Sequence, residues 1–167
     1  MIIDGTHDPA LKSWVTSANQ PDCDFPIQNL PFAVFRRAGA GEELHCGAAI
    51  GDRIVDLRAT HEAHLLPALT EEVSSACAAP DLGVLMGLGR GAWSSLRAAL
   101  SEALCAGRGN VERFAGALVP LAEVEFALPA RIGNYTDFYT SIQHATAQQD
   151  PTLHFDVGCF LRIVRRR

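Results

Sequence analysis

The sequence lacks a run of roughly 18 or more apolar residues, the length from which a membrane-spanning helix is predicted. This absence is informative because 48% of the 167 residues are hydrophobic. The first residues, Met1 to Asp4, also lack the basic segment and long apolar stretch of a signal peptide. We therefore expect a cytoplasmic protein without a membrane partner, whose apolar residues form a buried core.

Cysteine follows no pairing or metal-binding pattern. The five cysteines include no CxxC motif and their total is odd, which argues against a disulfide scaffold and against a cysteine zinc site. We expect reduced thiols that pack as small hydrophobic side chains. His61 and His64 are three residues apart, whereas the HExxH motif needs a spacing of four, so we interpret them as the polar edge of a loop or helix.

Charge is also low, at 20% of the residues, and the net charge is −5. Residues 162–167 include four arginines, so the rest of the chain is more acidic than the total indicates. An acidic surface repels nucleic acids and anionic lipids, and one short basic tail does not establish a polyanion site. The segment Gly87–Gly91 lacks the lysine of a phosphate-binding loop and follows no predicted strand, so we expect no nucleotide site there.

The chain is long enough for one domain, or one domain and part of another. Residues 32–37 predict a strand after a proline-punctuated extended segment. Residues 45–57 predict a β-hairpin, because two short apolar runs flank the two-residue turn Gly51-Asp52. Residues 118–128 predict a further strand with one wet face, closed by Pro129. Three strands so close in sequence, 32–57, indicate a small barrel-like sheet.

Three helices are expected before residue 110. Ala10–Val15 predicts a short helix after Pro9. Thr70 predicts the N-cap of a helix that runs through Ala79, with acidic residues in its first turn. A helix that begins near Gly91 and stops at Gly107 or Gly109 is predicted by a buried stripe at helical spacing, formed by Trp93, Leu96, Leu100 and Leu104.

A different helix, polar along one side, is predicted after Gly133. Thr136 is the expected N-cap, and Asp137, Thr140, Ser141 and His144 then share one face. Two helical turns place Asp137 and His144 about 10 Å apart, so one ligand could contact both. The pattern alone fits equally an aspartate that stabilises a helix terminus and an ordinary surface histidine.

Four segments, in order, resemble fumarylacetoacetase. The segment Ile132–Thr146 (IGNYTDFYTSIQHAT) is similar to the opening of the catalytic domain of that family. The other three segments precede it in the chain: Asp24–Phe35, Gly47–Leu57 and Met86–Trp93. Together they indicate similarity from about Ser13 to Thr146.

The resemblance implies an α+β fold in which a small SH3-like, partly open β-barrel with flanking helices precedes the start of a mixed-β catalytic domain. It implies four parts. Residues 1–20 are an N-terminal extension and residues 21–130 are the SH3-like domain. Residues 131–146 open the catalytic domain and residues 147–167 are a divergent tail.

The resemblance also implies a chemistry, the metal-assisted hydrolysis of 4-fumarylacetoacetate to fumarate and acetoacetate in tyrosine and phenylalanine catabolism. By position in the motif, Asp137 resembles the carboxylate ligand of the Ca²⁺ or Mg²⁺ ion of the family. His144 resembles the general base that activates water, and Tyr139 resembles the group that hydrogen-bonds the substrate. Intact members of the family are expected to be homodimers that take this small molecule as substrate.

The family pattern stops at Thr146, since residues 147–167 do not continue it. We therefore expect a truncated form with little activity alone, because a single carboxylate does not hold an ion that prefers six or more oxygen ligands. The alternative from another functional class is a non-catalytic, barrel-type interaction module.

Overall fold

The computed structural model describes residues 4–39, 41, 43–108 and 111–134. The chain divides into two compact units, Met1–Arg131 and Ile132–Arg167. The helices and strands given below belong to the first unit. No helix in the described part of the chain is long and apolar enough to cross a membrane.

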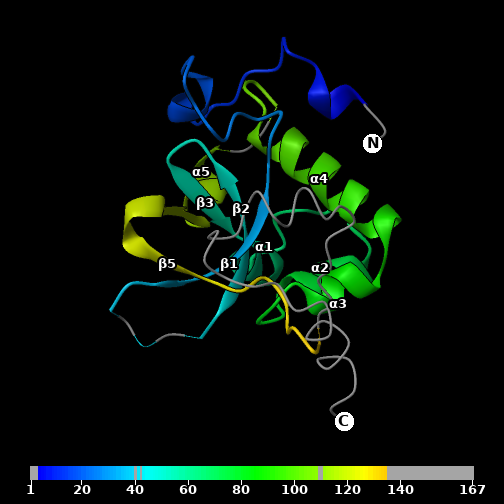
Figure 1. Cartoon of the computed structure of the whole chain (residues 1–167). Coiled ribbons are helices and arrows are strands. Elements are labelled where there is room, and N and C mark those ends of the chain that lie inside the picture. The colour runs from blue at the N-terminus through cyan, green and yellow to red at the C-terminus, as the bar shows by residue number, and fades with distance from the viewer. Residues whose placement is uncertain (1–3, 40, 42, 109–110, 135–167) are drawn as a thin grey trace, which may run out of the picture. The chain divides into compact units, whose positions relative to one another are not determined.

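The fold is α+β and centres on a five-stranded antiparallel sheet (Figure 1). The strand order is β4-β3-β2-β1-β5, with every neighbouring pair antiparallel. The bounds of the strands are Phe32–Arg37 (β1), His45–Ile50 (β2), Arg53–Asp56 (β3), Leu118–Pro120 (β4) and Val124–Ala127 (β5). The predictions of β1 and of the β2–β3 hairpin are confirmed.

β4 and β5 lie at opposite edges of this sheet, yet only one short 3-10 helix, η3 (Leu121–Glu123), joins them. The edges of a flat five-stranded sheet are about 19 Å apart, because neighbouring strands are about 4.8 Å apart. A 3-10 turn rises only about 2 Å per residue and cannot span that distance. The sheet therefore curls until its edges approach each other.

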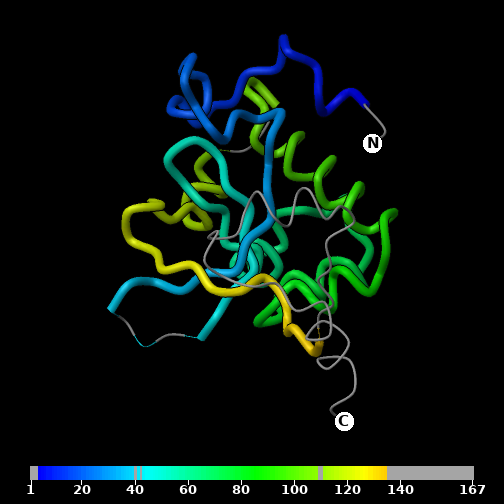
Figure 2. Tube along the Cα trace, viewed as in Figure 1, coloured from blue at the N-terminus to red at the C-terminus, as the bar shows by residue number. Residues whose placement is uncertain are grey.

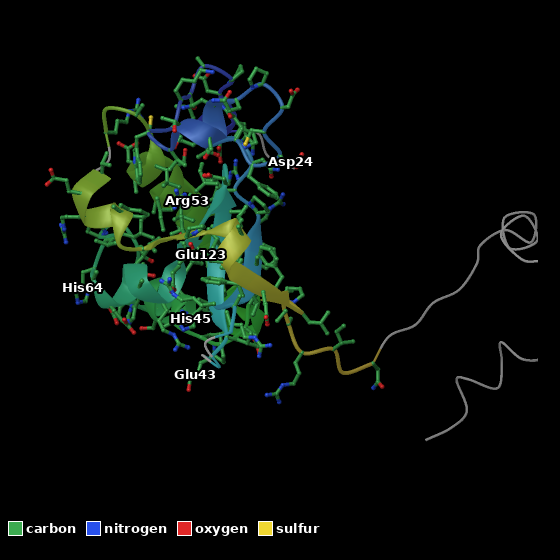
Figure 3. The ribbon with its side chains drawn as sticks, turned by 90° about the vertical axis from the view of Figure 1, so that its left-hand side faces the viewer. Asp24, Glu43, His45, Arg53, His64 and Glu123 are labelled. Atoms are coloured by element: carbon green, nitrogen blue, oxygen red, sulfur yellow. The ribbon has the colours of Figure 1, made fainter. Side chains whose placement is uncertain are left out.

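Two backbone hydrogen bonds fix η3 across one end of the curled sheet. The Leu121 amide donates to the Asp52 carbonyl at 2.9 Å, and the Ala38 amide donates to the Glu123 carbonyl at 2.8 Å. The first bond attaches η3 to the β2–β3 turn and the second attaches it to the end of β1. Figure 3 shows Glu123 of η3 and Arg53 of β3 near this end of the sheet.

A small apolar cluster fills the inner face of the curled sheet. Phe35, Ile54 and Val119 are buried there, with Leu121 and Val124 packed against them. Gly47 lies on the same face. A Cβ atom at this position would lie 2.7 Å from Ile54 and 2.8 Å from Phe35, so the two large side chains occupy the space that the glycine leaves.

The outer face of the sheet packs against the helices in a larger core (Figure 1). The helices are α1 (Leu57–Glu62), α2 (Glu71–Cys77), α3 (Gly83–Gly87), α4 (Arg90–Leu104) and α5 (Val111–Ala115). The Thr70 hydroxyl accepts the Val73 amide, which confirms the predicted N-cap. In α4, Leu96, Leu100 and Leu104 are fully buried, as their spacing predicts.

The prediction that Trp93 belongs to the buried stripe of α4 is wrong, because 38% of this residue is exposed. Its indole N–H donates to the Leu85 carbonyl at 2.7 Å. The side chain therefore lies at the junction of α3 and α4, where its polar atom finds a partner, and not in the core.

The predicted helix at Ala10–Val15 is wrong. The structure has 3-10 helices on either side of this segment, η1 (Gly5–His7) and η2 (Thr16–Asn19). Between them the chain is irregular, with a turn at Pro9-Ala10 and an isolated bridge from Ser13 to Cys105, and it lies against the end of α4 (Figure 2). The Trp14 amide donates to the Leu104 carbonyl and the Ala106 amide donates to the Lys12 carbonyl. These non-local bonds outweigh the weak helical pattern.

The prediction of a single strand within residues 118–128 is also wrong, because this segment is not continuous. It divides into β4, η3 and β5, and the two strands pair with different neighbours.

The β2–β3 turn is anchored under η2. Gly51 has φ +57°, and a Cβ atom there would lie 2.7 Å from the Ala18 amide nitrogen. The Ser17 hydroxyl donates to Asp52 Oδ1 at 2.5 Å and accepts the Asp52 amide at 3.1 Å. The bond from Ser17, with a smaller contribution from Arg53, lowers the pKa of Asp52 below its ordinary value.

The Gly47→Ala substitution should destabilise the unit by about 1–3 kcal/mol, because the added methyl group overpacks the inner cluster. The matched control is Gly116→Ala, where a Cβ atom meets nothing within 4 Å. The measurement is urea denaturation of both variants. Equal midpoints for the two variants would show that the inner face has room, which contradicts the packing described here.

The titration of Asp52 tests the turn. Its carboxyl should titrate below about 3.9, the value of an unperturbed aspartate, and Ser17→Ala should raise that midpoint. A lowered pKa in the folded state stabilises the fold above the unfolded pKa, and this stabilisation is lost as pH falls through the folded pKa. Carboxyl-detected NMR measures the midpoint, and an unchanged midpoint in Ser17→Ala would refute the role of the hydroxyl.

Candidate functional site

The three predicted site residues, Asp137, Tyr139 and His144, lie outside the described residues. The structure of the chain is given up to Asn134, inside the motif that carries them. Their mutual geometry therefore stays a prediction.

A partly buried histidine–aspartate pair joins β2 to β3. His45 Nδ1 lies 2.8 Å from Asp56 Oδ2, and the ring N–H donates because a carboxylate only accepts. The side chains of His45 and Asp56 are 21% and 11% exposed. The hairpin brings them together, since Gly47 is the register partner of Asp56 and His45 is two residues along the same face.

Asp56 has a second function at the start of α1. Its other oxygen, Oδ1, accepts the amides of Arg58 at 3.0 Å and Ala59 at 3.2 Å, so the carboxylate is the N-cap of that helix. The negative charge also suits the helix N-terminus. One carboxylate thus links two strands and a helix.

An ion pair and an aromatic ring border this pair. Arg58 Nη1 lies 3.0 Å from Glu43 Oε2, and Arg58 Nη2 donates to the Leu44 carbonyl at 3.4 Å. The Phe35 ring meets the His45 ring edge-on, with centroids 6.0 Å apart. Figure 3 shows Glu43 and His45 at the same end of the sheet.

A carboxylate that orients an imidazole is also found beside catalytic nucleophiles and metal ions. Among the residues described up to Asn134, no serine or cysteine side chain is hydrogen-bonded to His45, and no group of three or more His, Cys, Asp or Glu could hold a metal ion. The contacts that the structure gives this pair, across the hairpin and at the start of α1, stabilise the fold. Sequence reasoning missed the pair, although the register set by the Gly51-Asp52 turn pairs position 47 with position 56 and so places position 45 diagonally across from 56 on the same face.

The buried thiols do not form a reactive site. Cys46 and Cys77 are buried, and burial raises the pKa of Cys46 to about 12 and that of Cys77 to about 11. A thiol in this state is not nucleophilic near neutral pH. The Cys46 Sγ instead donates to the Ala79 carbonyl at 3.3 Å.

Comparison with known proteins assigns the unit to a family. The family model described as Fumarylacetoacetase N-terminal matches residues 28–129, which include the five strands and the five α-helices of the described residues. This chain belongs to the fumarylacetoacetase family. The assignment confirms the resemblance drawn from the four sequence segments.

Individual members of the fumarylacetoacetase family agree over a wider range. The fumarylacetoacetase of Oryza sativa subsp. japonica is 39% identical over 150 residues, which is 86% of this chain and 34% of that protein. Those of Rattus norvegicus and Homo sapiens are each 40% identical over 129 residues, 75% of this chain and 30% of theirs. The chain spans about a third of the length of the curated relatives it matches.

Asp56 provides a graded test of the pair. Asp56→Ala removes both the cap and the partner of His45 and should destabilise the unit by about 2–4 kcal/mol. Asp56→Asn keeps an oxygen for the cap and should cost less than half as much. Denaturant unfolding at neutral pH compares the two. If both variants lose the same stability, the cap makes no separate contribution.

Proposed function

We propose that this chain provides the N-terminal part of an enzyme that hydrolyses 4-fumarylacetoacetate to fumarate and acetoacetate. The observation that carries the proposal is the family match over residues 28–129. The motif at 132–146 follows that match directly in sequence and supports the same reaction. The activity would belong to tyrosine and phenylalanine catabolism in the cytoplasm.

The proposed roles fall on three residues of the motif. His144 accepts a proton from the water that attacks the diketone carbon, and Tyr139 donates a hydrogen bond to a substrate oxygen. Asp137 offers a carboxylate oxygen to a divalent cation. Carbon–carbon hydrolysis needs these functions because water is a weak nucleophile and the departing carbanion must be stabilised.

The one ligand that the resemblance assigns does not suffice for the Ca²⁺ or Mg²⁺ ion that the proposal implies. Such ions take six or more oxygen ligands, and Asp137 is the one ligand that the resemblance assigns to this chain. Among the described residues, no group of three or more His, Cys, Asp or Glu could hold a metal ion. The 167-residue chain should therefore bind metal weakly and have little activity alone.

The domain organisation is part of the proposal. We assign residues 21–130 to an SH3-like, partly open barrel, and the curl that η3 imposes on the sheet supports this class. Residues 1–20 are assigned to an N-terminal extension, 131–146 to the opening of the catalytic domain, and 147–167 to a divergent tail. The intact enzyme is proposed to be a homodimer.

A direct assay tests whether the 167-residue chain has little hydrolase activity alone. The purified chain, with Mg²⁺ or Ca²⁺, should hydrolyse fumarylacetoacetate at least about 1,000-fold more slowly than an intact relative such as the rat enzyme, because base and metal ligands act as a unit. Turnover close to that of the intact relative would refute this expectation.

A chimera distinguishes a chain that is inactive because it lacks the other metal ligands from a chain whose proposed function is wrong. Residues 1–146 of this chain replace the matching part of the intact relative, and the chimera should hydrolyse the substrate. His144→Asn in the chimera should lower kcat by about 10²–10⁴-fold. A folded chimera that is inactive, or one unaffected by His144→Asn, would contradict the proposed roles.

A further inference from the structure

A cavity of about 230 Å³ lies between α4, α5 and the loop formed by residues 65–68. Its lining is mainly apolar, and three of its side chains, Leu66, Ala99 and Phe114, belong to the buried core. No function is assigned to this cavity by the reaction proposed above.

Contacts within the fold hold the walls of the cavity. Phe114 packs edge-on against Trp14, with ring centroids 6.4 Å apart, and the Trp14 indole N–H donates to the Ala103 carbonyl at 2.9 Å. On the other side, the Leu65 amide donates to the Thr60 carbonyl at 2.9 Å and ends α1. A preformed apolar cavity avoids the ordering cost that weakens binding to flexible sites.

The charged side chains of the lining are two arginines and one glutamate. Arg108 Nη1 lies 3.0 Å from Glu102 Oε2, and these side chains are 58% and 65% exposed. Arg113 Nη2 donates to the Ala63 carbonyl at 3.4 Å. The lining therefore carries a net positive charge beside an apolar interior.

We propose that this cavity binds a small organic monocarboxylate with an apolar body. The apolar part enters between Leu66, Ala99 and Phe114, and the carboxylate replaces Glu102 on Arg108. The exchange costs little because an exposed ion pair contributes little to stability. A cavity of about 150 Å³ already accommodates benzene in another protein, so this one has room for a ring and a carboxylate.

Benzoate is a suitable probe, with neutral benzamide as its matched control. For a ligand of this size, binding of benzoate should have a Kd on the order of 1–10 mM. Amide NMR of the 167-residue chain measures it, and the shifts should be largest at Leu66, Ala99 and Phe114. Benzamide should bind several-fold more weakly.

Two variants of the charged pair give opposite predictions. Glu102→Gln removes the competing carboxylate and should tighten benzoate binding about two- to fivefold, whereas Arg108→Gln should weaken it by a similar factor. Benzamide binding should not respond to either. Arg36→Gln is the control, because it removes an arginine from a comparable exposed ion pair with Glu125 on the sheet.

Tighter binding in Glu102→Gln with weaker binding in Arg108→Gln supports the proposal. It is overturned if benzoate and benzamide bind equally, if both variants weaken benzoate, if shifts occur elsewhere in the chain, or if benzoate causes no saturable shift up to tens of millimolar.

Discussion

The fold of residues 4–131 depends on one covalent constraint, the short connection between the two edge strands. Because η3 is only three residues long, β4 and β5 must approach each other, and the intervening strands must curl to allow it. Hydrogen bonds from Leu121 to Asp52 and from Ala38 to Glu123 hold the connection in place. The curl divides the sheet into a narrow inner face and a broad outer face.

The two faces of the sheet accommodate different side chains. The inner face has room for a few large side chains, so Phe35 and Ile54 lie over Gly47, and His45 meets Asp56 at the end of the same face. The outer face is covered by helices and forms the larger core. Asp56 couples the two layers, because it pairs with a strand residue through one oxygen and caps α1 through the other.

Local sequence patterns were sufficient to predict the elements that short-range interactions determine. The Gly51-Asp52 turn predicted the hairpin, Thr70 predicted a helix start, and leucine spacing predicted the buried side of α4. Alternation within residues 118–128 could not show that β4 and β5 pair with different strands, since partner choice is non-local. The irregular structure of Ala10–Val15 was missed for the same reason, because hydrogen bonds of this segment reach the far end of α4.

The candidate site divides in a similar way. Asp137, Tyr139 and His144 came from resemblance to a motif, since helical spacing alone also fitted a surface helix. The family assignment of the chain supports that resemblance, while the positions of the three side chains lie beyond the described residues. The His45–Asp56 pair needed the hairpin register, which sequence supplies only once the turn is recognised.

Native-state hydrogen exchange tests the closure of the sheet most directly. If η3 holds the curl, the Leu121 and Ala38 amides should exchange only through global unfolding, with the same free energy as amides shared by β2 and β3. Exchange of Leu121 and Ala38 through local opening, several kcal/mol below the global value, would show that the sheet keeps its shape without this connection.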